Sequence, residues 1–275
     1  MMGIASTPDG GGYWTVASDG GVFTFGDAPF FGSRGGISPS TDPNACDVAG
    51  MVVTPDGQGY WLFDLDGNVY PFGDAAFKSD PAKTSACGET LSGDTIVSMA
   101  VTPDGGGYWL ATGSGKVFAY GDAGCLGDSY GFTSDAKCGP TGTESCVDNK
   151  CGPTGTELCP TVGITPTADG KGYWLADANG WVYPFGDATS YGNAFGSYAA
   201  CVFPVGVGNP GGGNLVVAGT TAPCTTIIGI WATQDGKGYW MLTAAGGIIT
   251  YGDATFSGSP SSLSLLAPIV SMEVG

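Results

Sequence analysis

Two sets of aspartates recur along the sequence at fixed spacing, and paired carboxylates could do chemistry. One aspartate of each pair opens an Asp-Gly turn, and the other is the centre of a Gly-Asp-Ala tripeptide. The turn set is Asp9, Asp56, Asp104, Asp169 and Asp235, and the tripeptide set is Asp27, Asp74, Asp122, Asp187 and Asp253. Such carboxylates could bind calcium or supply the acid and base of glycoside hydrolysis.

A structural role explains both sets of aspartates better. Asp accepts hydrogen bonds within its own turn, and Gly takes the positive φ that such turns require. The carboxylates also recur in every copy, as residues needed for folding do. We therefore predict no metal site and no catalytic residue, with calcium binding as the alternative.

The composition argues against an enzyme. The chain has no histidine, so it lacks the usual neutral-pH acid-base group and any Ser-His-Asp or Cys-His pair. The only glutamates are Glu89, Glu144, Glu157 and Glu273, and the first three lie in predicted loops. We expect no enzymatic activity and no cofactor.

The charge restricts the partners. The chain carries 25 acidic and 8 basic residues, a net charge of −17. Binding to nucleic acid needs clustered Lys and Arg, so we predict no nucleic-acid partner. No apolar stretch reaches the ~18 residues that span a bilayer, so we predict no membrane-spanning segment.

The aspartates belong to a repeat that aligns five times without gaps. In every copy a Tyr-Trp pair begins four residues after the turn aspartate, and Gly-Asp-Ala begins thirteen residues after that Tyr. All variation in length follows Gly-Asp-Ala. Each unit is therefore a constant core followed by a variable surface loop.

The elements that must position these residues are strands. Strand A is an apolar run such as 96–101, strand B begins at Tyr-Trp, and strand C alternates, as in 22–25. Tight Asp-Gly-type turns join them, and a short strand D such as 30–33 is expected to follow. Pro71 and Pro184 fall within strand C, which places that strand at an edge or a bulge.

Units of this kind suit the blades of a propeller. We predict an all-β, five-bladed β-propeller with three- to four-stranded antiparallel blades and long disulfide-bearing loops. It forms one domain over 1–275, and the alternative is a β-solenoid. The predicted blades are 1–45, 46–95, 96–160, 161–226 and 227–268. Residues 269–275 match strand A again, and we expect them to close the ring or to begin another unit.

The Gly-Tyr-Trp…Phe-Gly-Asp-Ala pattern resembles the tandem repeats of secreted and cell-surface proteins of actinobacteria. The resemblance covers all five units and implies propeller blades. It implies nothing specific about a ligand.

The Tyr-Trp pairs could stack on sugars, but neighbouring side chains on a strand face opposite ways. We therefore predict that they form the core between blades. The pairs are Tyr13-Trp14, Tyr60-Trp61, Tyr108-Trp109, Tyr173-Trp174 and Tyr239-Trp240. Trp181 and Trp231 depart from the repeat pattern and are the candidate ligand contacts.

All nine cysteines lie in predicted loops, which favours disulfides and an oxidising compartment. The predicted disulfide cysteines are Cys138, Cys146, Cys151, Cys159, Cys201 and Cys224. The first four lie in two consecutive copies of one nonapeptide, where pairing within each copy or crossed pairing would both work. Cys46, Cys87 and Cys125 remain as candidates for unpaired or intermolecular cysteines, and three cannot pair among themselves.

These patterns favour a secreted or cell-surface structural protein that assembles into a layer, sheath or filament. Its expected partners are its own copies or other surface proteins. The alternative is a lectin-like or adhesion module that binds a glycan or protein through its loops.

Overall fold

The structure is a computed structural model, and its described part is built from β-strands without an α-helix. The described residues are 1–37, 42, 47–79, 87–91, 93–130, 137–138, 144–145, 150–151, 157–158, 160–194, 214–215, 226–260 and 269–272. Each of the five repeats forms its own antiparallel sheet of strands A, B and C in that order. The prediction of an all-β fold made of repeated antiparallel sheets is confirmed.

The strands follow the predicted positions within each repeat. The first sheet comprises β1 (Gly3–Ser6), β2 (Gly12–Val16) and β3 (Val22–Gly26), and the second β4 (Val48–Val53), β5 (Gly59–Asp64) and β6 (Val69–Gly73). The third comprises β7 (Ile96–Val101), β8 (Gly107–Thr112) and β9 (Val117–Gly121), and the fourth β14 (Thr161–Pro166), β15 (Gly172–Asp177) and β16 (Val182–Gly186). The fifth comprises β18 (Ile227–Ala232), β19 (Gly238–Thr243) and β20 (Ile248–Gly252).

Strand C is the outer strand of the second and fourth sheets, as the prolines predict. Pro71 faces Trp61 across β5 and β6, and Pro184 faces Trp174 across β15 and β16. Proline has no backbone N–H to donate to a neighbouring strand. An outer strand tolerates it best, because one side of that strand has no hydrogen-bonding partner in the sheet.

The predicted strand D is absent at residues 30–33, which form no strand. Those residues pack instead: the ring of Phe31 lies 6.4 Å from that of Trp14 and 5.6 Å from that of Tyr60. Only the fifth sheet has a fourth strand among the described residues, β17 (Asn214–Leu215) beside β20.

The loop with the duplicated nonapeptide carries two small hairpins, and residues 269–272, the described part of the chain's last segment, form no strand. The hairpins pair β10 (Lys137–Cys138) with β11 (Glu144–Ser145), and β12 (Lys150–Cys151) with β13 (Glu157–Leu158). Residues 269–272, the predicted repetition of strand A, are irregular, and 273–275 lie outside the described part.

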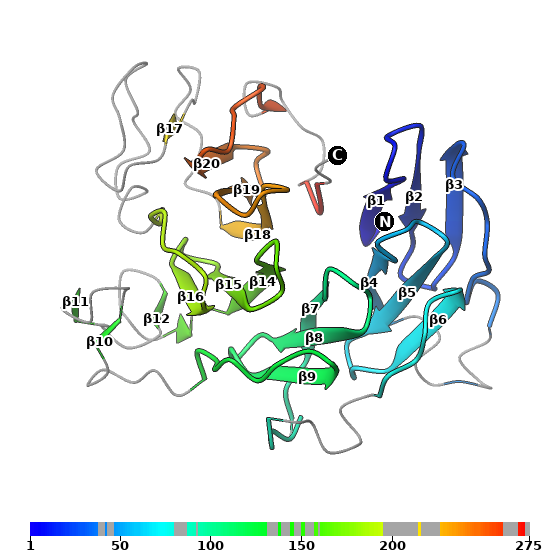
Figure 1. The fold of residues 1–275 in the computed structure, drawn as a ribbon, viewed down its shortest axis with the longest axis horizontal. Helices are drawn as coiled ribbons and strands as arrows, with labels where there is room; N and C mark the ends of the chain where they lie inside the picture. Colours follow the sequence, from blue (N-terminus) through cyan, green and yellow to red (C-terminus); the bar gives the residue numbers. More distant parts are fainter. Residues whose placement is uncertain are drawn as a thin grey trace. The chain divides into compact units, whose positions relative to one another are not determined.

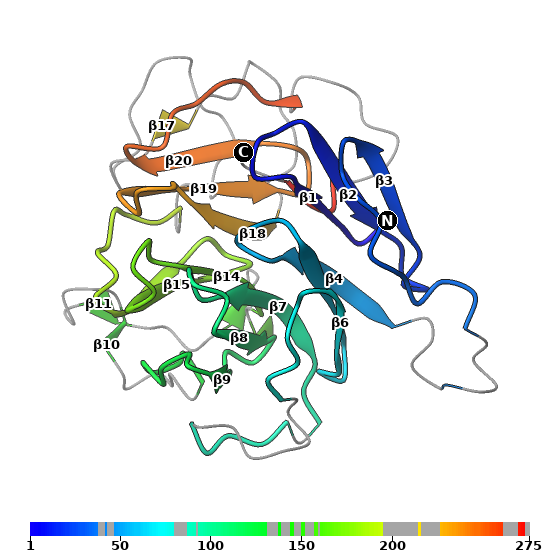
Figure 2. The ribbon, with the colours of Figure 1, turned by 45° about the vertical axis from the view of Figure 1, so that its right-hand side comes forward.

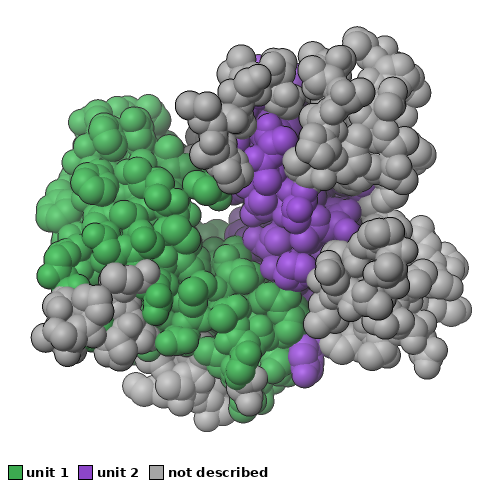
Figure 3. Space-filling view, turned by 180° about the vertical axis from the view of Figure 1, so that it is seen from behind, with its two compact units in different colours: residues 1–125, 270–275 green, residues 126–269 purple. Residues whose placement is uncertain are grey.

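The chain divides into two compact units, coloured green and purple in Figure 3. Unit 1 is residues 1–125 with 270–275, and unit 2 is residues 126–269. In unit 1 the A strands of successive sheets lie side by side, β1 against β4 and β4 against β7 (Figures 1 and 2). In unit 2, β14 lies against β18 in the same way. A single domain over 1–275 stays a prediction.

Aromatic side chains fill the space between neighbouring sheets of each unit. Trp14 lies 6.0 Å from Tyr60 of the next repeat, Trp61 6.3 Å from Tyr108, and Trp174 5.7 Å from Tyr239, measured between ring centroids. Each indole N–H donates to the carbonyl directly after its own Gly-Asp-Ala, for example from Trp14 to Pro29 at 2.7 Å. The ring is therefore buried with its one polar group satisfied.

Candidate functional site

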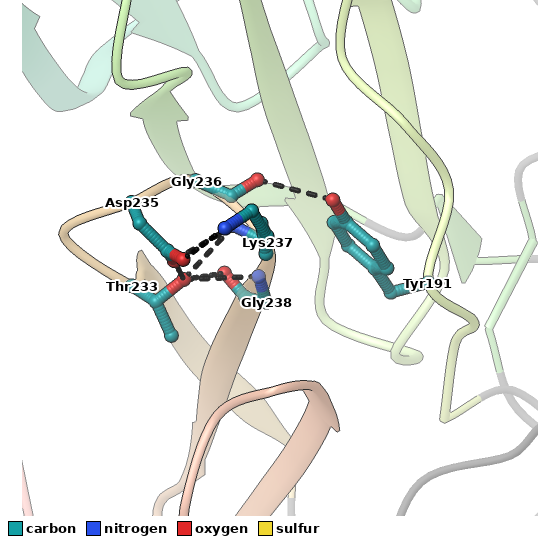
Figure 4. A network of polar contacts seen from close by, with 6 residues as sticks. All are labelled: Tyr191, Thr233, Asp235, Gly236, Lys237 and Gly238. Atoms are coloured by element: carbon teal, nitrogen blue, oxygen red, sulfur yellow. Dashed lines mark hydrogen bonds and ion pairs between the residues drawn. The ribbon is translucent and has the colours of Figure 1, made fainter.

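The first turn of every repeat is a polar network centred on a threonine. The Thr7 hydroxyl donates to the Asp9 carboxylate at 2.8 Å and accepts the N–H of Gly12 at 2.9 Å. The other copies use Thr54, Thr102, Thr167 and Thr233 in the same way. Figure 4 shows the fifth copy, in which Lys237 also pairs with Asp235 at 2.8 Å and Tyr191 donates to the Gly236 carbonyl at 3.2 Å.

The second aspartate of each pair closes over the same turn. The carboxylates of Asp27, Asp122 and Asp187 lie 3.2–3.4 Å from the threonine hydroxyl of their repeat. A Cβ on the glycine before each Tyr would come within 2.4–2.5 Å of a backbone atom and also crowd this carboxylate. Those glycines are Gly12, Gly59, Gly107, Gly172 and Gly238. The Gly-Tyr-Trp and Gly-Asp-Ala motifs therefore fit against each other.

The turn carboxylates are held ionised by their hydrogen bonds. The N–H of Gly11, followed by the Thr7 hydroxyl, lowers the pKa of Asp9. The ammonium of Lys237 and then the Lys237 N–H lower the pKa of Asp235 to about 2. A carboxylate that already accepts hydrogen bonds from its own turn stays ionised at neutral pH and is a poor proton donor.

The turns of the first two repeats border a cleft of about 370 Å³. Its lining residues are Thr7, Pro8, Asp9, Asp27, Pro29, Asp56, Gly57 and Gln58. Three of the predicted aspartates thus share one cleft within unit 1. Among the described residues, however, no group of three or more Asp, Glu, Cys or His side chains is arranged to hold a metal ion.

The second turn of the second to fifth repeats is capped by the residue that ends strand B, either an aspartate or a threonine. Asp64 and Asp177 take this position in the second and fourth repeats, and Thr112 and Thr243 in the third and fifth. Asp177 is only 2% exposed and accepts the N–H groups of Asn179 and Trp181, each at 2.9 Å. Its burial raises its pKa to about 6.

Replacing Asp177 with asparagine is expected to stabilise the protein at pH 7 but not at pH 3.5. Below pH 3.8 the carboxyl is protonated in both folded and unfolded chains. Between pH 3.8 and about 6 only the unfolded chain ionises, so Asp177 costs stability progressively as the pH rises. The full cost, on the order of 2–3 kcal/mol, is present above pH 6.

Urea denaturation of Asp177→Asn and the parent at both pH values measures this difference. Asp9→Asn is the control, because the pKa of Asp9 is lowered and its contribution is lost as the pH falls. The two variants should therefore change with pH in opposite directions. Parallel changes would contradict the assignment.

A tyrosine clasp holds the second to fifth repeats against the segment that follows the preceding Gly-Asp-Ala. The Tyr60 hydroxyl donates to the Gly32 carbonyl at 2.5 Å and accepts the Phe31 N–H at 3.2 Å. Tyr108 donates to Ser79, Tyr173 to Gly127 and Tyr239 to Gly192. Every acceptor lies six residues after the glycine of Gly-Asp-Ala. Sequence reasoning missed this clasp, although the aligned glycines Gly32, Gly127, Gly192 and Gly258 were a signal for it.

The ten residues predicted as core differ in their burial. Eight are fully buried or nearly so, at 0–1% exposure: Trp14, Tyr60, Trp61, Tyr108, Trp109, Tyr173, Trp174 and Tyr239. Tyr13 is 40% exposed, and Trp240 is partly exposed. The predicted core position is not found for Tyr13 among the described residues, where its ring stacks on Phe25 of its own hairpin.

The two tryptophans predicted as ligand contacts lie in separate places. Trp181 is in the second turn of the fourth repeat, where its backbone N–H donates to the Asp177 carboxylate. Trp231 lies on β18 opposite Trp240, and its ring packs over Gly229. Both side chains are partly exposed. Both belong to unit 2, whereas the residues that line the acidic cleft belong to unit 1.

Cys87 and Cys125 form a disulfide, with their Cα atoms 5.3 Å apart. This corrects their assignment as candidates for unpaired or intermolecular cysteines. Cys87 precedes β7 and Cys125 follows β9, so folding of the third sheet brings them together. Cys46 lies outside the described residues. So do the side chains of the six cysteines predicted to pair: Cys138, Cys146, Cys151, Cys159, Cys201 and Cys224.

Replacing Thr102 with valine is expected to lower the free energy of unfolding by about 1–3 kcal/mol. The methyl group keeps the side-chain volume but leaves the buried N–H of Gly107 without the hydroxyl that it meets at 2.8 Å. Chemical denaturation followed by tryptophan fluorescence measures the loss.

Thr15→Val is the matched control with the opposite sign. The Thr15 hydroxyl is buried with no hydrogen-bond partner among the described residues, and its counterparts Leu62, Leu110, Leu175 and Met241 are apolar. We expect this variant to gain about 1 kcal/mol. Equal losses from both variants would contradict a specific role for the Thr102 hydroxyl.

No protein-family model matches the chain, and no curated protein matches it either. Within its described residues the structure contains no helix long and apolar enough to cross a membrane.

Proposed function

We propose that the five sheets are the blades of a β-propeller and that the chain is a non-enzymatic structural subunit. Its role is to assemble with copies of itself or other surface proteins into a layer, sheath or filament. The observation that carries this proposal is the tyrosine clasp, which recurs between successive repeats. Each of these repeats therefore has a surface that binds another repeat of the same kind.

The polar groups of the repeats support a structural role. The aspartates that could have done chemistry are bonded to the threonine and the backbone N–H groups of their own turn. The same network stabilises all five copies, so no single copy stands out as a reaction centre. We therefore propose that the chain is not an enzyme and needs no cofactor.

We propose that the protein acts outside the cell or on its surface. The disulfide between Cys87 and Cys125 supports this location, because such bonds persist in oxidising compartments. The resemblance of the repeats to those of secreted and cell-surface actinobacterial proteins points the same way.

The alternative function is a glycan- or protein-binding module. The acidic cleft of about 370 Å³ favours it, because carboxylates next to prolines could hydrogen-bond and pack against a sugar. Trp181 and Trp231 remain candidate contacts for such a ligand.

Negative-stain electron microscopy of the purified full chain, beside a glycan-array screen of the same sample, separates the two functions. The structural proposal predicts ordered assemblies and no glycan signal. Dispersed single particles that bind a defined glycan would overturn it in favour of the binding module.

A further inference from the structure

The outer edge of strand C is the place where a further strand could join each sheet. The ladder between β2 and β3 begins at a bonded pair, in which the N–H of Ala17 donates to the Gly21 carbonyl at 2.9 Å. Bonded and non-bonded pairs alternate along an antiparallel ladder, so the pair of Trp14 and Thr24 is non-bonded. The backbone N–H and C=O groups of Thr24 therefore point away from β2, toward the outer edge.

The counterparts of Thr24 show how the other repeats close this edge. Pro71 and Pro184 take the position in the second and fourth repeats, and each faces the tryptophan of strand B as Thr24 does. A proline there has no N–H to offer an incoming strand. In the third repeat Ala119 is fully buried, at 0% exposure. In the fifth repeat Thr250 already pairs with β17, the fourth strand of that sheet (Figure 1).

The first repeat leaves the same position open within its unit. Thr24 is partly exposed, and no strand in the described part of the chain pairs with β3 on the side away from β2. Residues 22–26 also include no charged side chain that would keep another strand away. A closed propeller brings its sheets together through their faces, so closure of the ring would not cover this edge.

We propose that the outer edge of β3 pairs antiparallel with the same edge of a second copy of this chain. The strand is its own complement when Thr24 lies opposite Thr24 of the second copy across a two-fold axis, because each can donate its N–H to the carbonyl of the other. Two three-stranded sheets then form one six-stranded sheet across both copies. This inference rests on the proposed assembly function and names one contact that performs it.

Two features favour a second copy over an unrelated peptide. The pairing of β17 with β20 shows that the same edge of the fifth sheet accepts a short antiparallel strand of this chain. Residues 22–26 carry no charge, so they offer an acidic or basic peptide no ionic partner. A two-fold pair of identical strands needs none, because main-chain hydrogen bonds supply the attraction.

Sedimentation velocity of full-length variants tests the edge by removing a single N–H from each copy. Thr24→Pro should weaken dimerisation by about a hundredfold, since each copy loses one hydrogen bond and each bond contributes about tenfold. The fold should tolerate this change, because Pro71 and Pro184 stand at the same position, and circular dichroism checks it. Thr24→Val is the matched control, which changes the side chain, keeps the N–H and should dimerise like the parent.

Hydrogen exchange measured by mass spectrometry on the parent protein gives a second readout that needs no variant. The amides of residues 22–26 should exchange more slowly as the protein concentration rises, because pairing protects them. The corresponding residues 69–73 of the second repeat should not change, since Pro71 blocks their edge. Each copy carries a net charge of −17, so the samples are compared at high salt, which screens the repulsion between copies.

The outcomes separate this inference from the assembly function itself. If Thr24→Pro dimerises as strongly as the parent, the inference is wrong while assembly by other contacts stands. If exchange at residues 22–26 is fast or slow to the same extent at every concentration, no second copy pairs with this edge and the inference is again wrong. If the parent is monomeric at every concentration, both proposals fail.

Discussion

Replacing Trp61 with alanine is expected to lower the free energy of unfolding by about 3–5 kcal/mol, because it removes a large buried aromatic side chain. Trp61 is 1% exposed, packs against Tyr108 of the next repeat, and donates to the Ala76 carbonyl at 3.0 Å. The variant leaves a cavity between two sheets and an unsatisfied carbonyl. Guanidinium denaturation monitored by circular dichroism measures the loss.

The repeat provides a matched control at the same position. Trp240 makes the equivalent bond to the Thr255 carbonyl at 2.9 Å but is partly exposed. Trp240→Ala should therefore cost clearly less than Trp61→Ala. Equal losses of unfolding free energy in the two variants would show that the tryptophan stabilises mainly its own hairpin. Packing between sheets would then contribute little.

Replacing Gly26 with alanine is expected to destabilise the protein by about 3 kcal/mol, through backbone strain and overpacking. Gly26 has φ of +66°, and a Cβ there would lie 2.2 Å from the Gly11 carbonyl oxygen. The other Gly-Asp-Ala glycines have φ of 65–69° and equally close carbonyls. The tripeptide thus begins with glycine because any side chain at that position would clash with the backbone of the first turn.

Gly10→Ala in the same repeat separates strain from close approach. Gly10 has φ of +70° but no atom within 4 Å of the Cβ position. Its replacement should cost only the strain of the left-handed conformation, about 1–2 kcal/mol. Thermal denaturation of both variants gives the comparison, and a cost for Gly26→Ala no larger than for Gly10→Ala would contradict the proposed fit between turns.

The repeat alignment was sufficient to predict strands A, B and C of each repeat but not the absence of strand D at residues 30–33. Asp-Gly turns and alternating side chains placed strand A at 96–101 and strand C at 22–25, and the structure has β7 at Ile96–Val101 and β3 at Val22–Gly26. The prolines placed strand C at the outside of its sheet. These signals are local, because turn chemistry and ladder donors depend on a few neighbouring residues.

What the sequence could not predict depends on neighbours distant along the chain. The clasp joins Tyr60 to a carbonyl 28 residues earlier and Tyr239 to one 47 residues earlier, across loops of variable length. An alignment also treats all copies alike, so it placed Tyr13 in the core, although its exposure depends on whether another repeat covers it. The Cys87–Cys125 bond likewise links segments on either side of a whole sheet.

Sedimentation velocity of the full chain over a wide range of concentrations tests the central claim, assembly of the chain with its own copies, most directly. The account predicts a weight-average sedimentation coefficient that rises with concentration as oligomers form. A single monomeric species at every concentration would contradict it.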